Sequence, residues 1–238
     1  MAKRTQLPKG TGRGRTKQAA APVARSINSR ILLLIVIGVV VLVAAGIVLL
    51  QIQSLSRSPE VAGSVGEWTT WGPASAPVQI IEYSNFGCGY CRNFALGPGK
   101  QIRDEYEGTG KVHFEFKQFR LGDQSTTDAA NASECAADQG RFWDYHDLLF
   151  SQQGVSADPF TRSALKQYAA QLGLDTARFN RCVDDSQHLE KVYRDTQEGQ
   201  KQGVTGTPAF FINGEKVPGY ISYDALKGKI EAASQGTP

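Results

Sequence analysis

Acidic side chains are absent from the first 30 positions of this 238-residue chain, although eight of its 26 lysines and arginines lie there. The remaining positions therefore carry 18 basic and 23 acidic side chains, a net charge of −5. A mildly acidic domain lacks the clustered basic surface that nucleic-acid-binding proteins use. The composition thus argues against a nucleic-acid partner, and the overall charge of +3 reflects the N-terminal tail.

Charged and polar side chains are also missing from residues 31–50. A helix of this length extends roughly 30 Å, which matches the hydrocarbon core of a bilayer. The basic residues precede the run, so the positive-inside rule predicts a cytoplasmic N terminus and an extracytoplasmic remainder. A cleavable signal peptide has a shorter apolar core of about 7–15 residues and a small-residue cleavage site soon after it. We therefore expect an uncleaved, single-pass anchor in the cell membrane.

The changes in composition along the chain predict four parts. Residues 1–30 form a basic cytoplasmic tail, residues 31–50 the transmembrane anchor, residues 51–73 a polar linker, and residues 74–238 the extracytoplasmic domain. A short strand around residues 67–71 is expected at the end of the linker.

The domain alternates strand and helix signals. Residues 78–83 are apolar and β-branched, and residues 111–119 alternate apolar with polar side chains, which predicts two strands. Asn213–Gly214 between two short strand-like runs predicts a hairpin. Helices are expected over residues 88–106, 125–139, 141–153, 161–172, 176–184, 186–202 and 222–233. This order resembles a thioredoxin-type α/β core with a helical insertion over about residues 121–202.

Cysteine is scarce, with four in the chain, and Cys88–Gly89–Tyr90–Cys91 falls where a predicted strand ends and a helix begins. A helix start has unpaired N–H groups and the positive end of the helix dipole, which stabilise a thiolate. Cys88 should therefore be the exposed nucleophile. Cys91, one turn later on the same face, should resolve the mixed disulfide. Gly89 and Tyr90 are expected to set how strongly the reduced thiolate is favoured.

A Cys-x-x-Cys motif also occurs as half of a zinc site or as an inert structural disulfide. The sequence has no second such motif, and His113, His146 and His188 are scattered, so we predict neither a metal nor another cofactor. Four-residue disulfide loops are usually strained and labile, which favours a redox-active pair over a structural one. Pairing Cys88 with Cys91 leaves Cys135 with Cys182.

Several other side chains have a plainer interpretation. His146 is interpreted as a packed or surface histidine rather than a catalyst, and His188 with residues 190–194 as part of a solvated helix face. The aromatic residues near His146 are expected in the core of the insertion rather than in a ligand site: Phe142, Trp143, Tyr145 and Phe150.

Residues 82–91, 139–150 and 206–212 occur in an order that, taken together, resembles the DsbA-like thioredoxin-fold family of bacterial thiol–disulfide oxidoreductases, over about residues 74–235. The resemblance implies that Pro208 is cis and faces Cys88. It also implies that Thr207 offers its backbone to an extended substrate segment, which would contact Gly89 and Tyr90 as well.

The same resemblance implies two further roles. Glu82 lies six residues before Cys88, where thioredoxin-fold enzymes usually have a buried acid, and it would take the proton of Cys91 during resolution. A solvent-facing edge residue is the alternative. Some relatives carry a pair equivalent to Cys135 and Cys182 as a structural disulfide, whereas free buried cysteines are the alternative. An extracytoplasmic location favours the disulfide.

These expectations combine into an oxidase that introduces disulfides into unfolded or partly folded exported proteins through Cys88 and Cys91. The resemblance implies a DsbB- or VKOR-like membrane protein as the partner that reoxidises the pair. A disulfide isomerase or a reductase, for example in cytochrome c maturation, would share every motif. A chaperone or binding module that keeps the fold without catalysis is a further alternative. A glutathione S-transferase of the kappa type fits less well, because it lacks the second thiol and the anchor.

Overall fold

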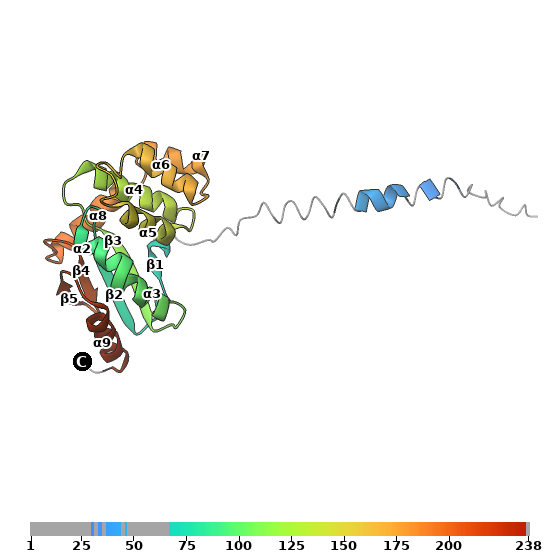
Figure 1. The fold of residues 1–238 in the computed structure, drawn as a ribbon. Helices are drawn as coiled ribbons and strands as arrows, with labels where there is room; N and C mark the ends of the chain where they lie inside the picture. The colour runs from blue at the N-terminus through green and yellow to red at the C-terminus, as the bar shows by residue number, and fades with distance from the viewer. Residues whose placement is uncertain (1–29, 31–32, 35–36, 44–45, 47–66, 237–238) are drawn as a thin grey trace, which may run out of the picture. The chain divides into compact units, whose positions relative to one another are not determined.

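The computed structural model describes residues 30, 33–34, 37–43, 46 and 67–236 (Figure 1). The chain divides into two compact units, Met1–Val61 and Ala62–Pro238. The predicted catalytic site and all the strands of the described residues lie in the second unit.

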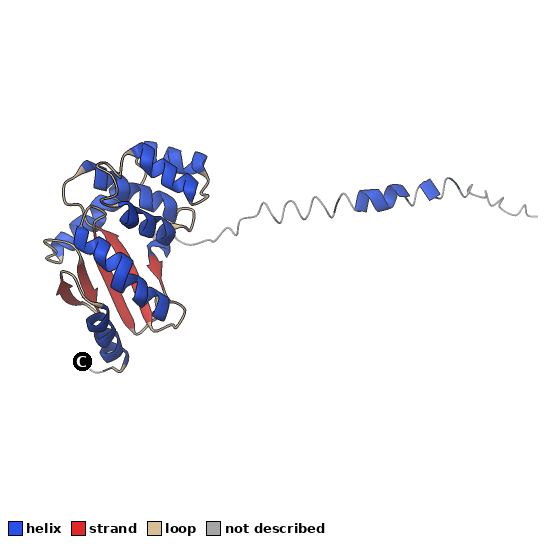
Figure 2. Ribbon diagram, viewed as in Figure 1, coloured by secondary structure: helices blue, strands red, loops and turns tan. Residues whose placement is uncertain are grey.

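Five strands form one mixed sheet in the order β1-β3-β2-β4-β5 (Figure 2). The strands are β1 (Thr70–Trp71), β2 (Val78–Ser84), β3 (Val112–Gln118), β4 (Ala209–Ile212) and β5 (Glu215–Pro218). β2 and β3 are parallel, and the other neighbouring pairs are antiparallel. β2 lies in the centre with mostly buried side chains on both faces, which explains its continuous apolar character. The strands and the hairpin predicted from the sequence are confirmed.

One face of the sheet packs against α2 (Gly89–Phe94), the π-helical segment η2 (Ala95–Gly99), α3 (Lys100–Tyr106) and α9 (Tyr223–Ser234). The sequence predicts a helix over residues 88–106, and residues 89–106 are helical, but the helix is kinked and divides into three segments. The backbone of Gly97 leaves the helical region (φ −118°, ψ −105°), and Pro98 follows it without an N–H group to continue the hydrogen-bond ladder. The kink at Gly97 therefore separates α2, which carries the cysteines, from α3.

The sheet begins earlier than the boundary expected at residue 74. A short 3-10 helix, η1 (Glu67–Thr69), leads into β1, which pairs with β3 through Thr70 and Trp71. The Trp71 ring is buried and stacks on Phe114 with the ring centroids 5.3 Å apart. Residues assigned to the linker therefore contribute to the core, because an aromatic side chain there completes the edge of the sheet.

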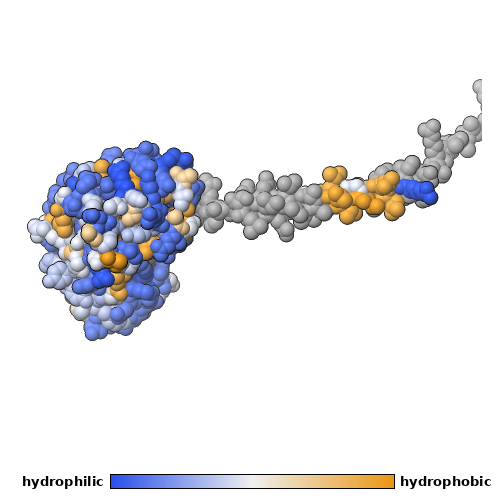
Figure 3. Space-filling view, turned by 45° about the horizontal axis from the view of Figure 1, so that its top comes forward, coloured by the Kyte–Doolittle hydropathy of each residue, from blue (hydrophilic) through white to orange (hydrophobic). Residues whose placement is uncertain are grey.

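In the first unit, the described residues are helical, and those from 37 to 43 are strongly hydrophobic (Figure 3). Among the described residues, no helix reaches the length and apolarity needed to cross a membrane. Nearly all of the predicted tail, much of the predicted anchor and most of the predicted linker lie outside the described residues, so these assignments stay predictions.

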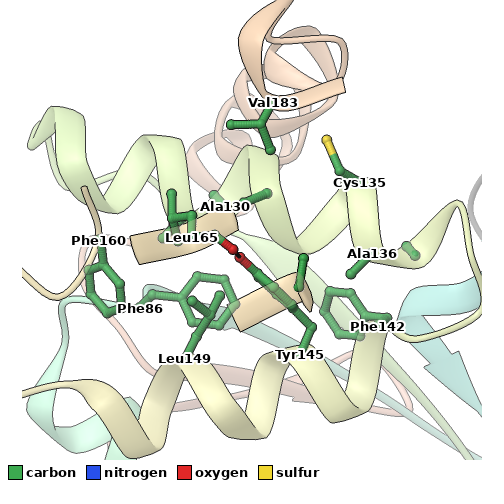
Figure 4. Close-up of a cluster of buried hydrophobic side chains, with 14 of the residues drawn as sticks. Phe86, Ala130, Cys135, Ala136, Phe142, Tyr145, Leu149, Phe160, Leu165 and Val183 are labelled. Carbon is green, nitrogen blue, oxygen red and sulfur yellow. Dashed lines mark hydrogen bonds between the residues drawn. The ribbon is translucent and has the colours of Figure 1, made fainter. Parts of the chain in front are cut away.

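Five helices form the insertion between β3 and β4: α4 (Gln124–Ala137), α5 (Phe142–Gln152), α6 (Arg162–Gln171), α7 (Thr176–Asp184) and α8 (Leu189–Lys201). The five helices predicted there are confirmed, with small differences at their ends. Figure 4 shows their shared core, in which the Tyr145 hydroxyl donates to the Leu165 carbonyl at 2.8 Å. Phe86, from the turn that precedes Cys88, lies in the same cluster. The insertion therefore packs directly against the turn that carries the cysteines.

Candidate active site

Cys88 occupies the N-cap position of α2. Its backbone is extended (φ −83°, ψ 118°), and its Sγ accepts a hydrogen bond from the Cys91 N–H at 3.4 Å. The preceding turn is held by Asn85, whose side chain accepts from the Gly87 N–H at 2.8 Å and donates to the Phe119 carbonyl at 2.9 Å. Because N-cap side chains lie against the unpaired N–H groups of the first turn, this sulfur sits where a negative charge is stabilised.

The two thiols differ in exposure and in acidity. Cys91 is fully buried, whereas Cys88 is partly exposed. The hydrogen bond with the Cys91 thiol is the largest cause that lowers the pKa of Cys88 to about 5, against the opposing effect of burial. Thr207 and the backbone N–H groups of Tyr90 and Cys91 add to this lowering. Burial, together with Cys88 and the charge of Glu82, raises the pKa of Cys91 far above its ordinary value. At neutral pH the reduced pair therefore holds a thiolate on Cys88 and a thiol on Cys91.

The proline loop faces the cysteines. Thr207–Pro208 is a cis peptide bond in the loop that leads into β4. The Thr207 carbonyl oxygen lies 3.2 Å from Cys88 Sγ and accepts a hydrogen bond from the thiol when Cys88 is protonated. β4 pairs with β2 through Ala209 and Tyr83, which brings this loop beside the end of β2. The two motifs, 119 positions apart in the sequence, thus meet at one site.

Glu82 lies on β2, on the sheet face that α2 and α3 cover. Its side chain is 2% exposed, and its neighbours across the sheet are Phe116 and Phe210. Burial raises the pKa of this carboxyl to about 8, so it is largely protonated at neutral pH. The residue is therefore a buried acid, and the alternative of a solvent-facing edge residue is excluded.

Gly89 and Tyr90 are exposed beside a shallow groove of about 450 Å³. The groove is lined by Tyr90, Arg92, Asn93, Leu96, Gly97, Pro98 and Tyr220. Most of the domain surface in Figure 3 is hydrophilic, whereas Tyr90 is 67% exposed and Leu96 and Tyr220 are also exposed. The sequence pattern does not identify Leu96, because an apolar residue on a helix indicates the core unless the kink at Gly97 is known. Tyr220 lies in the loop between β5 and α9, and its approach to α2 depends on the fold.

His146 on α5 is packed as expected, with its side chain inside a shell of aromatic rings that includes Phe86, Phe116 and Phe150. Together with Glu82 it lines a small cavity of about 10 Å³. The sequence pattern does not predict this position, because it depends on how the insertion docks on the sheet.

Cys135 on α4 and Cys182 on α7 form a disulfide, the pairing that the resemblance implies. The imidazole of His188 lies beside them, so that the potential ligand atoms of these three residues fall within 4.8 Å of one another. It is the one such group of three within the described residues. Its sulfurs are held in the disulfide and do not offer the thiolates that bind a metal.

Residues 65–232 match the family model for thioredoxin. The chain belongs to the thioredoxin family. Its sequence is 32% identical over 168 residues to Na⁺/H⁺ antiporter NhaA 1 of Salinispora arenicola, a match that covers 70% of this chain and 24% of that protein. The chain thus spans about a quarter of the length of the first curated relatives it matches.

Two further proteins match over most of their length. Disulfide bond formation protein D of Bacillus subtilis is 25% identical over 190 residues, which are 77% of this chain and 83% of that protein. The crystal structure of α-DsbA1 from Wolbachia pipientis superimposes with a TM-score of 0.62 at 26% identity, over 71% of this chain and 92% of that one. Within the thioredoxin family, the chain is therefore of the DsbA type.

Proposed function

We propose that this domain is a thiol–disulfide oxidase that introduces disulfides into exported proteins. The observation that carries the proposal is the contrast between the two thiols. Cys88 can be reached from solvent and its pKa is lowered to about 5, whereas Cys91 is buried and keeps its proton. Stabilising the thiolate favours the reduced pair, which makes the disulfide form a strong oxidant. The name of the Bacillus subtilis relative, disulfide bond formation protein D, supports the same direction.

The reaction starts from the Cys88–Cys91 disulfide. A client thiolate attacks Cys88 Sγ, the S–S bond breaks, and its electron pair goes to Cys91 Sγ. The Cys91 thiolate, in apolar surroundings, takes a proton from the Glu82 carboxyl, which is largely protonated at neutral pH. The second thiolate of the client then attacks the client sulfur that is bonded to Cys88 in the mixed disulfide. This attack forms the client disulfide and releases Cys88 as a stabilised thiolate. Two electrons pass from the client to the cysteine pair.

Client binding would depend on hydrogen bonds to the client's backbone rather than on the identity of its side chains. An extended segment beside the loop of Thr207 and Pro208 would pair with its backbone as an added strand does. The groove beside Tyr90 offers exposed apolar surface at Leu96 and Tyr220. Such a surface suits unfolded or partly folded clients, whose apolar side chains are still accessible.

We also propose that residues 31–50 anchor the domain in the membrane with the N terminus in the cytoplasm. The apolar run and the basic tail before it support this arrangement. The Cys135–Cys182 disulfide fits an oxidising compartment outside the cytoplasm. A DsbB- or VKOR-like membrane protein would reoxidise the reduced pair, and anchoring would keep the domain close to it.

A redox titration of the purified full chain against glutathione tests the direction of the reaction. An oxidase should have a reduction potential well above about −200 mV, as DsbA does, because its reduced form is stabilised. A value near that of thioredoxin, about −270 mV, would instead identify a reductase.

Trapping of clients tests catalysis itself. A Cys91→Ser variant cannot resolve the mixed disulfide, so it should accumulate covalent complexes with exported proteins that a reducing agent releases. A Cys88→Ser variant should trap none. If cells carrying Cys88→Ser fold their exported proteins normally and the Cys91→Ser variant traps no client, the domain is a binding module rather than an oxidase.

A further inference from the structure

Two buried polar atoms without a protein partner lie on residues that line one cavity between the sheet, η2 and α5. In the part of the chain that the structure describes, Glu82 Oε1 and His146 Nε2 have no hydrogen-bond partner. Both side chains line the cavity of about 10 Å³, and Arg103 is the other charged residue in its wall. Buried polar atoms in native proteins nearly always pair with protein or water. A cavity of roughly 10–15 Å³ is just large enough for one water molecule.

The tautomer of His146 follows from its other nitrogen. Nδ1 lies 2.8 Å from Asp147 Oδ1, and Asp147 also pairs with the guanidinium of Arg103. Burial acts to raise the pKa of Asp147, but hydrogen bonds from His146 and Arg103 outweigh it and lower the pKa. An ionised carboxylate only accepts hydrogen bonds, so the neutral imidazole carries its proton on Nδ1. Nε2 is then an unprotonated acceptor.

The neighbouring charges allow His146 to hold a proton transiently. Burial lowers the pKa of His146, Arg103 lowers it further, and Asp147 acts in the opposite direction. The imidazole is therefore neutral at rest, and when protonated it is paired with the Asp147 carboxylate. The Asp147 side chain is 31% exposed and reaches solvent. Glu82, in turn, is influenced by the charge on Cys88 and itself acts on Cys91.

We propose that a water molecule in this cavity joins the Glu82 carboxyl to His146 Nε2, and that His146 passes the proton of the resolving step between Glu82 and the surface at Asp147. The proposal rests on the proposed function, since it concerns the same two thiols. His146 acts through Glu82 and is a positioning residue rather than a catalytic one. It provides the second half of a path that Glu82, closed off from bulk water, does not complete alone.

Protons and electrons balance in the direction of reoxidation. The Cys88 thiolate attacks an oxidising disulfide, forms a mixed disulfide and expels one thiolate. The Glu82 carboxyl, largely protonated at neutral pH, first gives its proton through the water to His146 Nε2, which forms an imidazolium ion paired with Asp147. Cys91 then loses its proton to the ionised Glu82 and attacks Cys88 Sγ, which expels the second thiolate, closes the Cys88–Cys91 disulfide and leaves Glu82 protonated again. Release of that proton to solvent restores the neutral ring.

An aromatic disulfide such as dithiobis(nitrobenzoate), added in one equivalent to the reduced full chain, separates the two steps. Each step releases one coloured aromatic thiolate, so the first phase reports the attack by Cys88 and the second reports the attack by Cys91. A His146→Leu variant should keep the rate of the first phase and slow the second at least roughly tenfold, since positioned proton transfer typically contributes about 10²–10⁴-fold. Equal slowing of both phases, or an unchanged second phase, overturns the relay.

His188→Leu is the matched control. His188 is also a largely buried histidine of the insertion with a carboxylate partner, Asp138, at 2.8 Å, but it lies beside the structural disulfide instead of the cavity. It should leave both phases unchanged. A double-mutant cycle adds a second criterion: if His146 acts through Glu82, His146→Leu should slow the second phase little further in a Glu82→Gln background. Slowing that multiplies in the double variant contradicts a shared path.

The wild-type protein provides a readout that needs no variant to fold. Nitrogen NMR should show His146 as the neutral Nδ1–H tautomer at pH 7, and an Nε2–H tautomer overturns the relay. The first kinetic phase separates the two proposals. A wild-type chain without a fast first phase at neutral pH contradicts the oxidase itself, whereas a normal first phase with an unaffected second phase in His146→Leu contradicts only the relay.

Discussion

Cys88 and Cys91 are three positions apart, yet their sulfurs meet opposite surroundings. One accepts the N–H group at the start of α2, and the other lies among buried side chains. Carboxamidomethylation with iodoacetamide should therefore follow a pH curve with a midpoint near 5 for Cys88, because only the thiolate reacts. In a Cys88→Ala variant, Cys91 should stay unreactive across the neutral range. A midpoint near the ordinary thiol value of about 8.5 would contradict an activated nucleophile.

The same ionisation affects the stability of the reduced protein. The pKa of Cys88 is depressed in the folded state, so its contribution is present above the ordinary thiol pKa and is lost as the pH falls through about 5. The disulfide form has no such thiol and lacks this dependence, so the reduced form gains stability over the oxidised form as the pH rises within that window.

The ionisation of Glu82 changes stability with pH in the opposite direction. Its folded-state pKa is raised from 4.5 to about 8 by burial, so the folded state holds a proton that the unfolded chain has lost. Stability should therefore fall as the pH rises from about 4.5 to 8, by several kcal/mol at roughly 1.4 kcal/mol per pKa unit. Glu82→Gln should remove this loss, so that the oxidised variant is more stable than the wild type at pH 8 and similar to it at pH 4.5.

Urea unfolding of the oxidised protein at the two pH values measures this difference. Glu231→Gln, on the exposed side of α9, is the control and should follow the wild-type curve. A Glu82→Gln variant that loses stability with pH as steeply as the wild type would show that the carboxyl is not the source.

At the scale of elements, α8 is joined to α4 and to the end of β3 by a buried polar network. Lys191 on α8 lies 3.1 Å from Glu134 and 2.9 Å from Asp195, and its side chain is 15% exposed. Gln118 donates to Glu134 and to the Ser133 hydroxyl. Removing one member of a buried ionic network leaves charges without a partner, which usually costs about 3–5 kcal/mol.

Lys191→Met should therefore lower the free energy of unfolding by about 3 kcal/mol or more, because Glu134 and Asp195 would remain buried without their cation. Lys166→Met is the matched control, since Lys166 pairs at 2.6 Å with Asp184, whose side chain is largely exposed. Exposed pairs contribute about 0–1 kcal/mol. Chemical denaturation of both variants measures the two losses in the free energy of unfolding. Equal losses would show that the buried network stabilises the fold no more than an exposed ion pair does.

The sequence predicts most elements because their signals are local. The helices of the insertion are bounded by glycine and by capping side chains such as Asp123, Thr161 and Asp175, which accept from the first turn. Glycine and proline inside the predicted helix over residues 88–106 did not reveal whether the helix ends or bends there. The pairing of β1 depends on Trp71 stacking on Phe114, a contact between residues distant in the sequence.

The same distinction between local signals and long-range contacts applies to the residues of the candidate site. The Cys-x-x-Cys spacing and its place before a helix are local, so the roles expected for the two thiols follow from the chain itself. The facing of Cys88 by Thr207 and the burial of Glu82 were expected through a family resemblance, because neither is encoded within one segment. The approach of His146 to Glu82 needs the docking of α5 on the sheet, which no periodicity specifies.

At the scale of the whole molecule, one disulfide closes the insertion on itself. Cys135 and Cys182 are separated by 47 positions, and loop-closure entropy for that interval is worth about 4 kcal/mol. A Cys135→Ala/Cys182→Ala variant should unfold at lower urea concentration, with a loss of up to about 4 kcal/mol. Its Cys88 should keep the pH midpoint of the wild type, because the bridge joins α4 to α7 away from the active-site turn. A shifted midpoint would show that the two pairs are coupled.

In the oxidised form, the chain would hold two disulfides that should differ in how readily they are reduced. Reduction of the Cys88–Cys91 pair yields a stabilised thiolate at a partly exposed sulfur, whereas Cys135 and Cys182 are 1% and 3% exposed and pack within the insertion core. A dithiol reductant reaches an exposed sulfur faster, and a stabilised thiolate favours its product. Graded dithiothreitol followed by alkylation and mass spectrometry should therefore label Cys88 and Cys91 at concentrations that leave the second pair intact. Simultaneous labelling of all four cysteines would mean that the insertion opens before the active pair is reduced. That result would contradict the assignment of the oxidising power to the Cys88–Cys91 pair.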